Sequence, residues 1–240
     1  MLHKTRGIVL KTTAYAESSV VVQIFTEKFG VQAYLVNGVK RAKAKITLNI
    51  LQPLHLLEMV VYHKHTGGLQ RIAEARQIPP FQHIPYDVLK RSIVLFLNEM
   101  VYKSMKHQGP DEALFAFLFN TISWLDAVEQ APLNFHLVFL LKLTKFLGFY
   151  PAAQQSGQVY FDLKEGVFTR HMPNHALILQ EPYTTQWYVL LESKLTEITS
   201  IKISNVDRRI LLHMIVTFYQ LHLDGIGDVK SLEVLEEVLK

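Results

Sequence analysis

The apolar positions of this 240-residue chain follow two spacings, and the change comes near residue 80. The first part contains short runs rich in valine, isoleucine and aromatic residues, separated by turn signals such as Phe29-Gly30 and Asn37-Gly38, which is typical of β-strands. We expect strands at 7–12, 18–26, 31–36, 53–62 and 69–75. Five strands in about eighty residues predict a small closed or nearly closed barrel with the OB-fold pattern.

The second part has the spacing of amphipathic helices, and a group of prolines within 79–85 separates it from the first. Asp111 is placed to cap one helix and Gly148 to end another. A short hairpin at 159–162 and 166–169 interrupts the helical pattern. The expected helices cover 87–107, 112–129, 132–147, 184–195, 207–223 and 230–240.

Together these patterns predict an α+β chain with two domains. Residues 1–79 form the five-stranded OB-fold barrel, and residues 80–240 form a mostly α-helical domain with a small β-hairpin insert at about 150–175. The chain is 49% hydrophobic, which is enough to bury an ordered core.

Charge is distributed unevenly between the two predicted domains. Residues 1–79 contain 11 Lys and Arg against 4 Asp and Glu, a net charge of +7, whereas residues 80–240 contain 14 against 17, a net charge of −3. These two values give the +4 of the whole chain. The imbalance indicates an anionic partner for the first domain, and nucleic acid and acidic membrane surfaces are the usual candidates.

The densest group of cations in the chain is the segment between residues 40 and 45. Its members are Lys40, Arg41, Lys43 and Lys45. Cations this close repel one another and favour an exposed loop, whereas a phosphate chain opposite them binds through counterion release. One interpretation is a solvated loop that only keeps the protein soluble. We favour DNA binding, because the wider excess of positive charge supports it. Three further cations near the amino terminus are secondary candidates: Lys4, Arg6 and Lys11.

Aromatic residues of the barrel region are a second source of nucleic-acid contacts, because OB barrels often hold single strands with basic and aromatic groups. The region contains Tyr15, Phe25, Phe29, Tyr34 and Tyr62. We expect most of them in the core, and the alternation of the strands does not say which face each one takes.

Several kinds of functional site are excluded or disfavoured by the residues present. The chain has no cysteine, so it has neither a disulfide nor a thiolate zinc site. The pairs His63/His65 and His171/His175 lack further ligands, and we predict no metal and no other cofactor. Phosphate-binding loops, nucleophile elbows and the His-Glu-x-x-His motif are absent, which favours a protein that binds rather than catalyses.

The sequence also lacks membrane signals. No apolar run approaches the length of a membrane span, and the amino-terminal residues do not have the pattern of a signal peptide. We therefore expect a cytoplasmic protein without membrane contact.

Several short segments occur in the order and with the spacing of a known family. They are Lys4–Leu10 followed by Tyr15–Ser19, Phe25–Gly30, Gly38–Arg41, Leu51–Leu54, Tyr160–Asp162 with Gly166–Phe168, and Leu221–Leu223 with Leu232. In these segments, which extend over nearly the whole chain, the sequence resembles the RecO family of bacterial recombinational repair proteins.

The resemblance implies an amino-terminal OB-fold and a helical carboxyl-terminal domain. It further implies binding to single- and double-stranded DNA, annealing of complementary strands, and loading of a RecA-type recombinase onto DNA coated with single-stranded DNA-binding protein. The implied partners are RecR and the carboxyl-terminal tail of single-stranded DNA-binding protein. The implied location is the bacterial cytoplasm, in association with the nucleoid.

One departure from the family concerns the insert. Many members of the family carry a four-cysteine zinc site there, whereas this chain has Gln154–Gly157 and Arg170–Pro173 without a cysteine. We expect the insert to be retained without its metal and to be ordered by packing of Tyr160, Phe161 and Phe168.

Two alternatives to a DNA-binding repair protein stay open at this point. The first is a helical scaffold that joins other proteins through residues 80–240, with only incidental DNA contact. The second is a hydrolase whose carboxylate or histidine site matches no motif.

Overall fold

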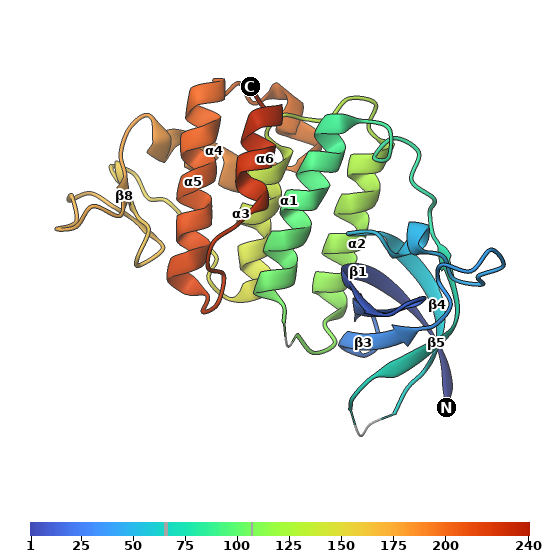
Figure 1. The fold of residues 1–240 in the computed structure, drawn as a ribbon. Coiled ribbons are helices and arrows are strands. Elements are labelled where there is room, and N and C mark those ends of the chain that lie inside the picture. Colours follow the sequence, from blue (N-terminus) through green and yellow to red (C-terminus); the bar gives the residue numbers. More distant parts are fainter. Residues whose placement is uncertain (65–66, 107) are drawn as a thin grey trace. The chain divides into compact units, whose positions relative to one another are not determined.

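The computed structural model describes residues 1–64, 67–106 and 108–240. They form two compact units, Met1–Glu129 and Gln130–Lys240 (Figure 1). The predicted domain boundary at residues 79 and 80 lies within the first unit, and a division at that point stays a prediction.

The first unit begins with a closed five-stranded barrel of order β1-β2-β3-β5-β4, which confirms the architecture predicted from the strand spacing. The strands are β1 Leu2–Ala16, β2 Ser19–Thr26, β3 Gly30–Val36, β4 Leu56–Tyr62 and β5 Gln70–Gln77, and a short 3-10 helix, η1 Leu48–Leu51, precedes β4. β3 and β5 run parallel, and all other neighbours are antiparallel.

β1 closes the barrel because it pairs with two strands in turn. Its first half, from Leu2 to Ile8, pairs with β4, and its second half pairs with β2. A register shift after Val9 accompanies the change of partner, as a β-bulge does in a strongly bent strand. The sequence pattern predicted only 7–12 as strand, because most of the flanking residues are polar or small and become strand only through their partners.

The barrel interior is filled by alternate side chains of the strands. Val9, Ile24 and Tyr34 are fully buried there. Gly7 also points inward, and a Cβ at this position would come within 2.5 Å of Met59 and 2.6 Å of Ile24. The interior is therefore packed without space for a side chain at residue 7.

Two helices complete the first unit, and both were predicted: α1 Val88–Ser104 and α2 Glu112–Ala127. The Asp87 carboxylate accepts the backbone N–H of Lys90 (2.9 Å), and the Asp111 carboxylate accepts that of Leu114 (2.8 Å). Each acid thus satisfies an N–H that has no partner within its helix, which confirms the predicted cap at Asp111.

The end of α2 is fastened to the segment before α1 by Asp126, which is buried. Its carboxylate accepts the backbone N–H groups of Gln82, His83 and Ile84, at 2.7, 3.0 and 2.8 Å. From α1, the buried Lys90 donates to carbonyl groups at the end of α2. Together these contacts bind the end of α2 to the segment after β5 and to α1.

The second unit contains four helices among its described residues: α3 Phe135–Leu147, α4 Tyr183–Glu192, α5 Asn205–His222 and α6 Ser231–Val238, with a 3-10 helix, η2 Leu195–Ser200. Nine of the 13 residues of α3 are buried, so α3 is the core of this unit. It ends at Gly148, which adopts φ 86°, as predicted.

The predicted start of α3 at Pro132 is wrong, because the helix begins three residues later. The N–H of Phe135 donates to the Pro132 carbonyl in a turn (3.0 Å). Asn134 holds this turn, since its side chain donates to the Ile201 carbonyl (2.8 Å) and accepts a hydrogen bond from Arg208 (2.9 Å).

The insert is a three-stranded sheet of order β7-β6-β8. Its strands are β6 Tyr160–Asp162, β7 Val167–Thr169 and β8 Ile178–Leu179. The hairpin of β6 and β7 was predicted. β8 was not, because two residues are too short for a pattern and their partners Phe161 and Asp162 are distant in sequence.

Aromatic rings join the insert to the helices of its unit. Phe161 is fully buried and lies 4.8 Å from Phe168, 5.1 Å from Trp187 of α4 and 5.8 Å from Phe218 of α5 between ring centroids. The predicted packing of Phe161 and Phe168 is confirmed, whereas Tyr160 is only half-buried.

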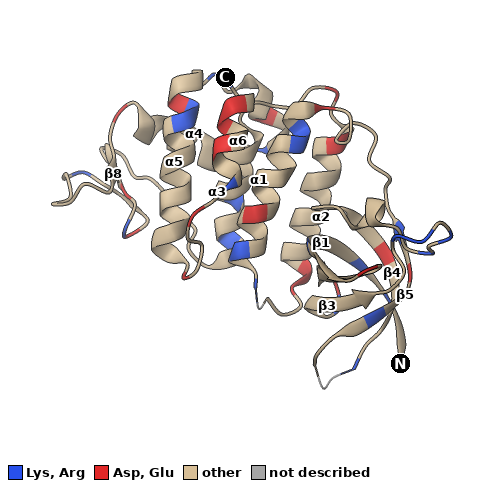
Figure 2. Cartoon of the chain, viewed as in Figure 1, with Lys and Arg blue, Asp and Glu red and all other residues tan. Residues whose placement is uncertain are grey.

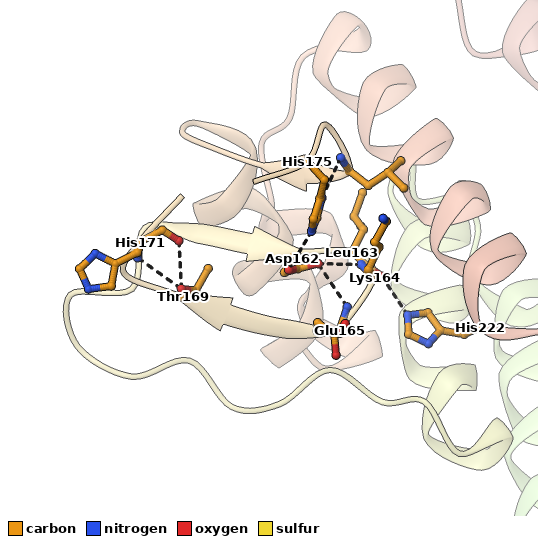
Figure 3. A network of polar contacts seen from close by, with 9 residues as sticks. Asp162, Leu163, Lys164, Glu165, Thr169, His171, His175 and His222 are labelled. Atoms are coloured by element: carbon orange, nitrogen blue, oxygen red, sulfur yellow. Dashed lines mark hydrogen bonds and ion pairs between the residues drawn. The ribbon is translucent and has the colours of Figure 1, made fainter. Parts of the chain in front are cut away.

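Asp162 is the centre of a polar network in the insert (Figure 3). Its carboxylate accepts the backbone N–H groups of Lys164 (2.8 Å) and Glu165 (3.2 Å), which hold the β6–β7 turn. It also lies 3.1 Å from Nε2 of His175. Because Nδ1 of His175 accepts the N–H of Leu177, Nε2 is the nitrogen that donates to Asp162. The network ties the segment before β8 to β6.

Replacement of Asp162 by alanine is expected to loosen the insert while the helices stay folded, because it removes the partner of two backbone N–H groups and of His175. We expect amide hydrogens of residues 163–179 to exchange about tenfold faster, as measured by hydrogen–deuterium exchange with mass spectrometry. His171→Ala is the matched control, since this nearby histidine is exposed and its backbone alone makes the contacts with Thr169. Equal protection in Asp162→Ala and the unchanged protein would contradict this role.

Replacement of Asp126 by alanine is expected to lower the free energy of unfolding by about 2 to 4 kcal/mol, because three backbone donors lose their acceptor. Urea unfolding monitored by circular dichroism measures the change. Asp126→Asn keeps one acceptor oxygen, so its free energy of unfolding should lie between those of Asp126→Ala and the unchanged protein. Asp224→Ala, which removes an exposed acid, is the control. A loss no larger than that of the control would show that the contacts do not stabilise the unit.

Candidate nucleic-acid interface

The basic loop, defined as Lys40–Lys45, lies between β3 and η1 and projects from the barrel, where Figure 2 shows it as a run of blue. It is anchored at both ends, because the flanking side chains of Val39 and Ile46 are 4% and 7% exposed and belong to the barrel core. The loop is therefore held by its ends while its cations stay outside.

Backbone hydrogen bonds shape the loop and fix it to the β1–β2 hairpin. The N–H of Val39 donates to the Ser18 carbonyl at the hairpin tip (2.9 Å). Within the loop, the N–H of Arg41 donates to Gly38 (3.1 Å) and that of Ala44 donates to Arg41 (3.0 Å). Gly38 adopts φ 71°, a conformation that glycine takes without strain. Two successive turns thus present the segment as a compact projection.

All four cations of the basic loop are exposed: Lys40, Arg41, Lys43 and Lys45. Over the described residues, none of the four has an ion-pair partner within 4.0 Å. No acidic residue occurs in sequence between Glu27 and Glu58. The loop is accordingly a concentrated positive charge that an external anion is free to approach.

Arg6, a secondary candidate, is engaged by the protein itself. Its guanidinium donates to both carboxylate oxygens of Glu27, at 3.0 and 2.6 Å, and lies 5.3 and 4.9 Å from the ring centroids of Phe115 and Phe119 in α2. The hydrogen bond from Arg6 lowers the pKa of Glu27 below its usual value. Arg6 therefore contributes charge that Glu27 largely balances.

The other two secondary candidates have different surroundings. Nζ of Lys11 lies 4.9 Å from the ring centroid of Tyr102 in α1, with the side chain exposed. Lys4 lines a hollow on the outer side of β1, β4 and β5 together with Glu58 and Glu74. Neither residue has the concentrated, unbalanced charge of the basic loop.

The aromatic residues of the barrel divide into core and surface. Phe25 and Tyr34 are fully buried, and Phe29 stacks on His63 with 3.9 Å between ring centroids. Tyr15 and Tyr62 are 63% and 48% exposed. Tyr62 shares a second hollow with two cations that the sequence pattern did not single out, because Lys64 and Arg71 stand alone in the sequence.

In the described parts of the chain, residues 1–64, 67–106 and 108–240, no three His, Cys, Asp or Glu side chains are grouped so that they could hold a metal ion. His175 is bonded to Asp162, and His171 is exposed. Of the pair His63 and His65, for which we also predicted no metal, His65 lies outside the described residues. Across the same ranges, no helix has the length and hydropathy to cross a membrane.

Comparison with known proteins covers nearly the whole chain. Residues 1–81 match the protein-family model described as Recombination protein O N terminal, and residues 85–233 match that described as Recombination protein O C terminal.

Full-length relatives agree with the family models. A protein of Flavobacterium psychrophilum named DNA repair protein RecO is 38% identical over 239 residues, which cover 98% of each chain. A protein of the same name from Phocaeicola vulgatus is 33% identical over 239 residues, which cover 99% of each chain. With a barrel and a helical region that both match, the chain belongs to the RecO family of DNA repair proteins.

Proposed function

We propose that the protein binds single- and double-stranded DNA through the basic loop and acts in recombinational repair without catalysing a reaction. The observation that carries this proposal is the set of four exposed cations on a loop whose two ends are buried in the barrel. Family membership and the names of the relatives support the repair role.

The anchored loop suits a phosphate backbone for two physical reasons. Its turns and buried ends hold the cations in place before DNA arrives, so less conformational freedom is lost on binding. Each phosphate that a cation neutralises releases condensed counterions, which makes the affinity depend on salt and little on sequence.

Strand annealing follows from the same charge. Two complementary strands repel each other, and cations that neutralise phosphates on both strands reduce the repulsion and bring the strands together. Loading of a RecA-type recombinase, with RecR and the tail of single-stranded DNA-binding protein as partners, is supported by the resemblance to the RecO family alone.

Two other functions make different predictions. A helical scaffold with incidental DNA contact would keep its full activity when the loop cations are removed. A hydrolase would release nucleotides from DNA in the presence of magnesium or manganese, and we expect no product in that assay.

Replacement of the four loop cations by alanine is expected to weaken binding to single- and double-stranded DNA by at least about tenfold at low salt. Because about four phosphate contacts are lost, the slope of log affinity against log salt should flatten by about 3. Fluorescence anisotropy of labelled oligonucleotides over a series of NaCl concentrations measures both quantities.

The matched control removes the same charge elsewhere in the chain. This control variant replaces four exposed lysines by alanine: Lys106, Lys145, Lys164 and Lys202. An unchanged slope in the loop variant, or an equal change in the control, would remove the basic loop from the mechanism.

Annealing of complementary strands coated with single-stranded DNA-binding protein tests the role in repair. We expect the loop variant to anneal these strands more slowly than the unchanged protein, because it no longer screens the phosphates of both strands. The rate of fluorescence quenching between end-labelled strands is the measurement. Full annealing by a variant that no longer binds DNA would point to the scaffold instead.

A further inference from the structure

A hollow of about 460 Å³ lies where β4 and β5 meet, away from the basic loop in sequence. It is lined by Tyr62, Lys64, Leu69, Gln70 and Arg71. Tyr62 and Leu69 are 48% and 49% exposed, and the two cations are exposed as well. The hollow therefore offers an aromatic surface, an apolar side chain and two positive charges, and none of the described residues that line it is an acid.

A second hollow on the barrel, of about 360 Å³, shows the contrast. There Lys4 and Arg76 face Glu58 and Glu74, and Nε of Arg76 donates to the Glu58 carboxylate (2.7 Å). The charges of this hollow balance, whereas those of the hollow at Tyr62 are all positive. An anion is therefore favoured at Tyr62 and not at Lys4.

Gln70 braces the backbone beside the hollow and is only 3% exposed. Its side-chain oxygen accepts the N–H of Lys64 (3.1 Å), and its amide donates to the carbonyls of Lys64 (3.2 Å) and Gly67 (3.4 Å). The backbone at Lys64 and at Gly67 is thereby held to β5. The backbone of Lys64 is thus positioned before any ligand binds.

The strand register places the hollow beside β3, the strand that precedes the basic loop. Arg71 on β5 lies beside Leu35 on β3 and also beside Tyr62 on β4. These three residues form one row across neighbouring strands, which lie about 4.8 Å apart. Leu35 is next to the end of β3, and the basic loop begins soon after it.

We propose that this hollow is a nucleotide subsite for single-stranded DNA, in which an unpaired base stacks on Tyr62 and the flanking phosphates contact Lys64 and Arg71. The proposal rests on the proposed DNA binding and adds a preference to it. Stacking on an aromatic side chain needs a base that is free of its own helix, so duplex DNA gains little from this site. The basic loop, in contrast, acts on the phosphates of either form.

The test uses the full chain with labelled oligothymidylate and with a labelled duplex of random sequence. Tyr62→Leu is expected to weaken binding of the single strand about tenfold, leave binding of the duplex unchanged and leave the salt slope unchanged. Tyr62→Phe should retain binding, because the ring is kept. The double variant Lys64→Gln, Arg71→Gln should flatten the single-strand salt slope by about 1.4, as two lost phosphate contacts require.

Tyr86→Leu is the matched control, since this tyrosine is 84% exposed and lies outside the barrel strands. Thermal unfolding shows whether each variant is folded, and retention by Tyr62→Phe separates the ring from a folding effect. Unchanged single-strand binding by Tyr62→Leu, or an equal loss for single strand and duplex, would overturn the subsite. If Tyr62→Leu binds single strands normally while the loop variant loses binding to single- and double-stranded DNA, the subsite is wrong and the proposed function stands. If Tyr62→Leu weakens single-strand binding while the loop variant binds DNA normally, the basic loop has no part in DNA binding.

Discussion

The double pairing of β1 is the constraint on which the rest of the barrel depends. One strand bonds to β4 with its first half and to β2 with its second, and this closes the sheet. The closed interior leaves no space for a side chain at Gly7. β1 also leads to the hairpin tip at Ser18, whose carbonyl accepts a hydrogen bond from the N–H of Val39, just before the basic loop. The shape of the candidate DNA contact is therefore a consequence of barrel closure.

The basic loop, Arg6 and Lys90 show three different surroundings for a positive charge in this chain. The cations of the basic loop are exposed and unbalanced, so they attract an external anion. Arg6 is used internally, because Glu27 binds it and two phenylalanine rings lie beside it. Lys90 is buried and donates to carbonyls at the end of α2, where it stabilises the fold. Among these three groups, only the cations of the basic loop have charge available for an external anion, although all appear alike in a count of lysine and arginine.

The insert shows how a small sheet is ordered without cysteine ligands. Its inner side packs Phe161 against rings from two helices, and its outer segment is held by the bond between Asp162 and His175. A buried carboxylate with three donors fixes the turn and the strand end together. Directional hydrogen bonds and ring packing thus order the insert of this chain.

The sequence by itself determined the barrel, the helices and the excess of charge, because strand spacing, helix spacing and charge are local properties. Asp111 and Gly148 marked helix ends for the same reason, since caps act within one turn. Only the tertiary structure decided the features that depend on distant partners. These are the full length of β1, the strand β8, the later start of α3 and the ion pair between Arg6 and Glu27. It also decided that Tyr62, Lys64 and Arg71 share one hollow, because strand register brings together residues that are isolated in the sequence.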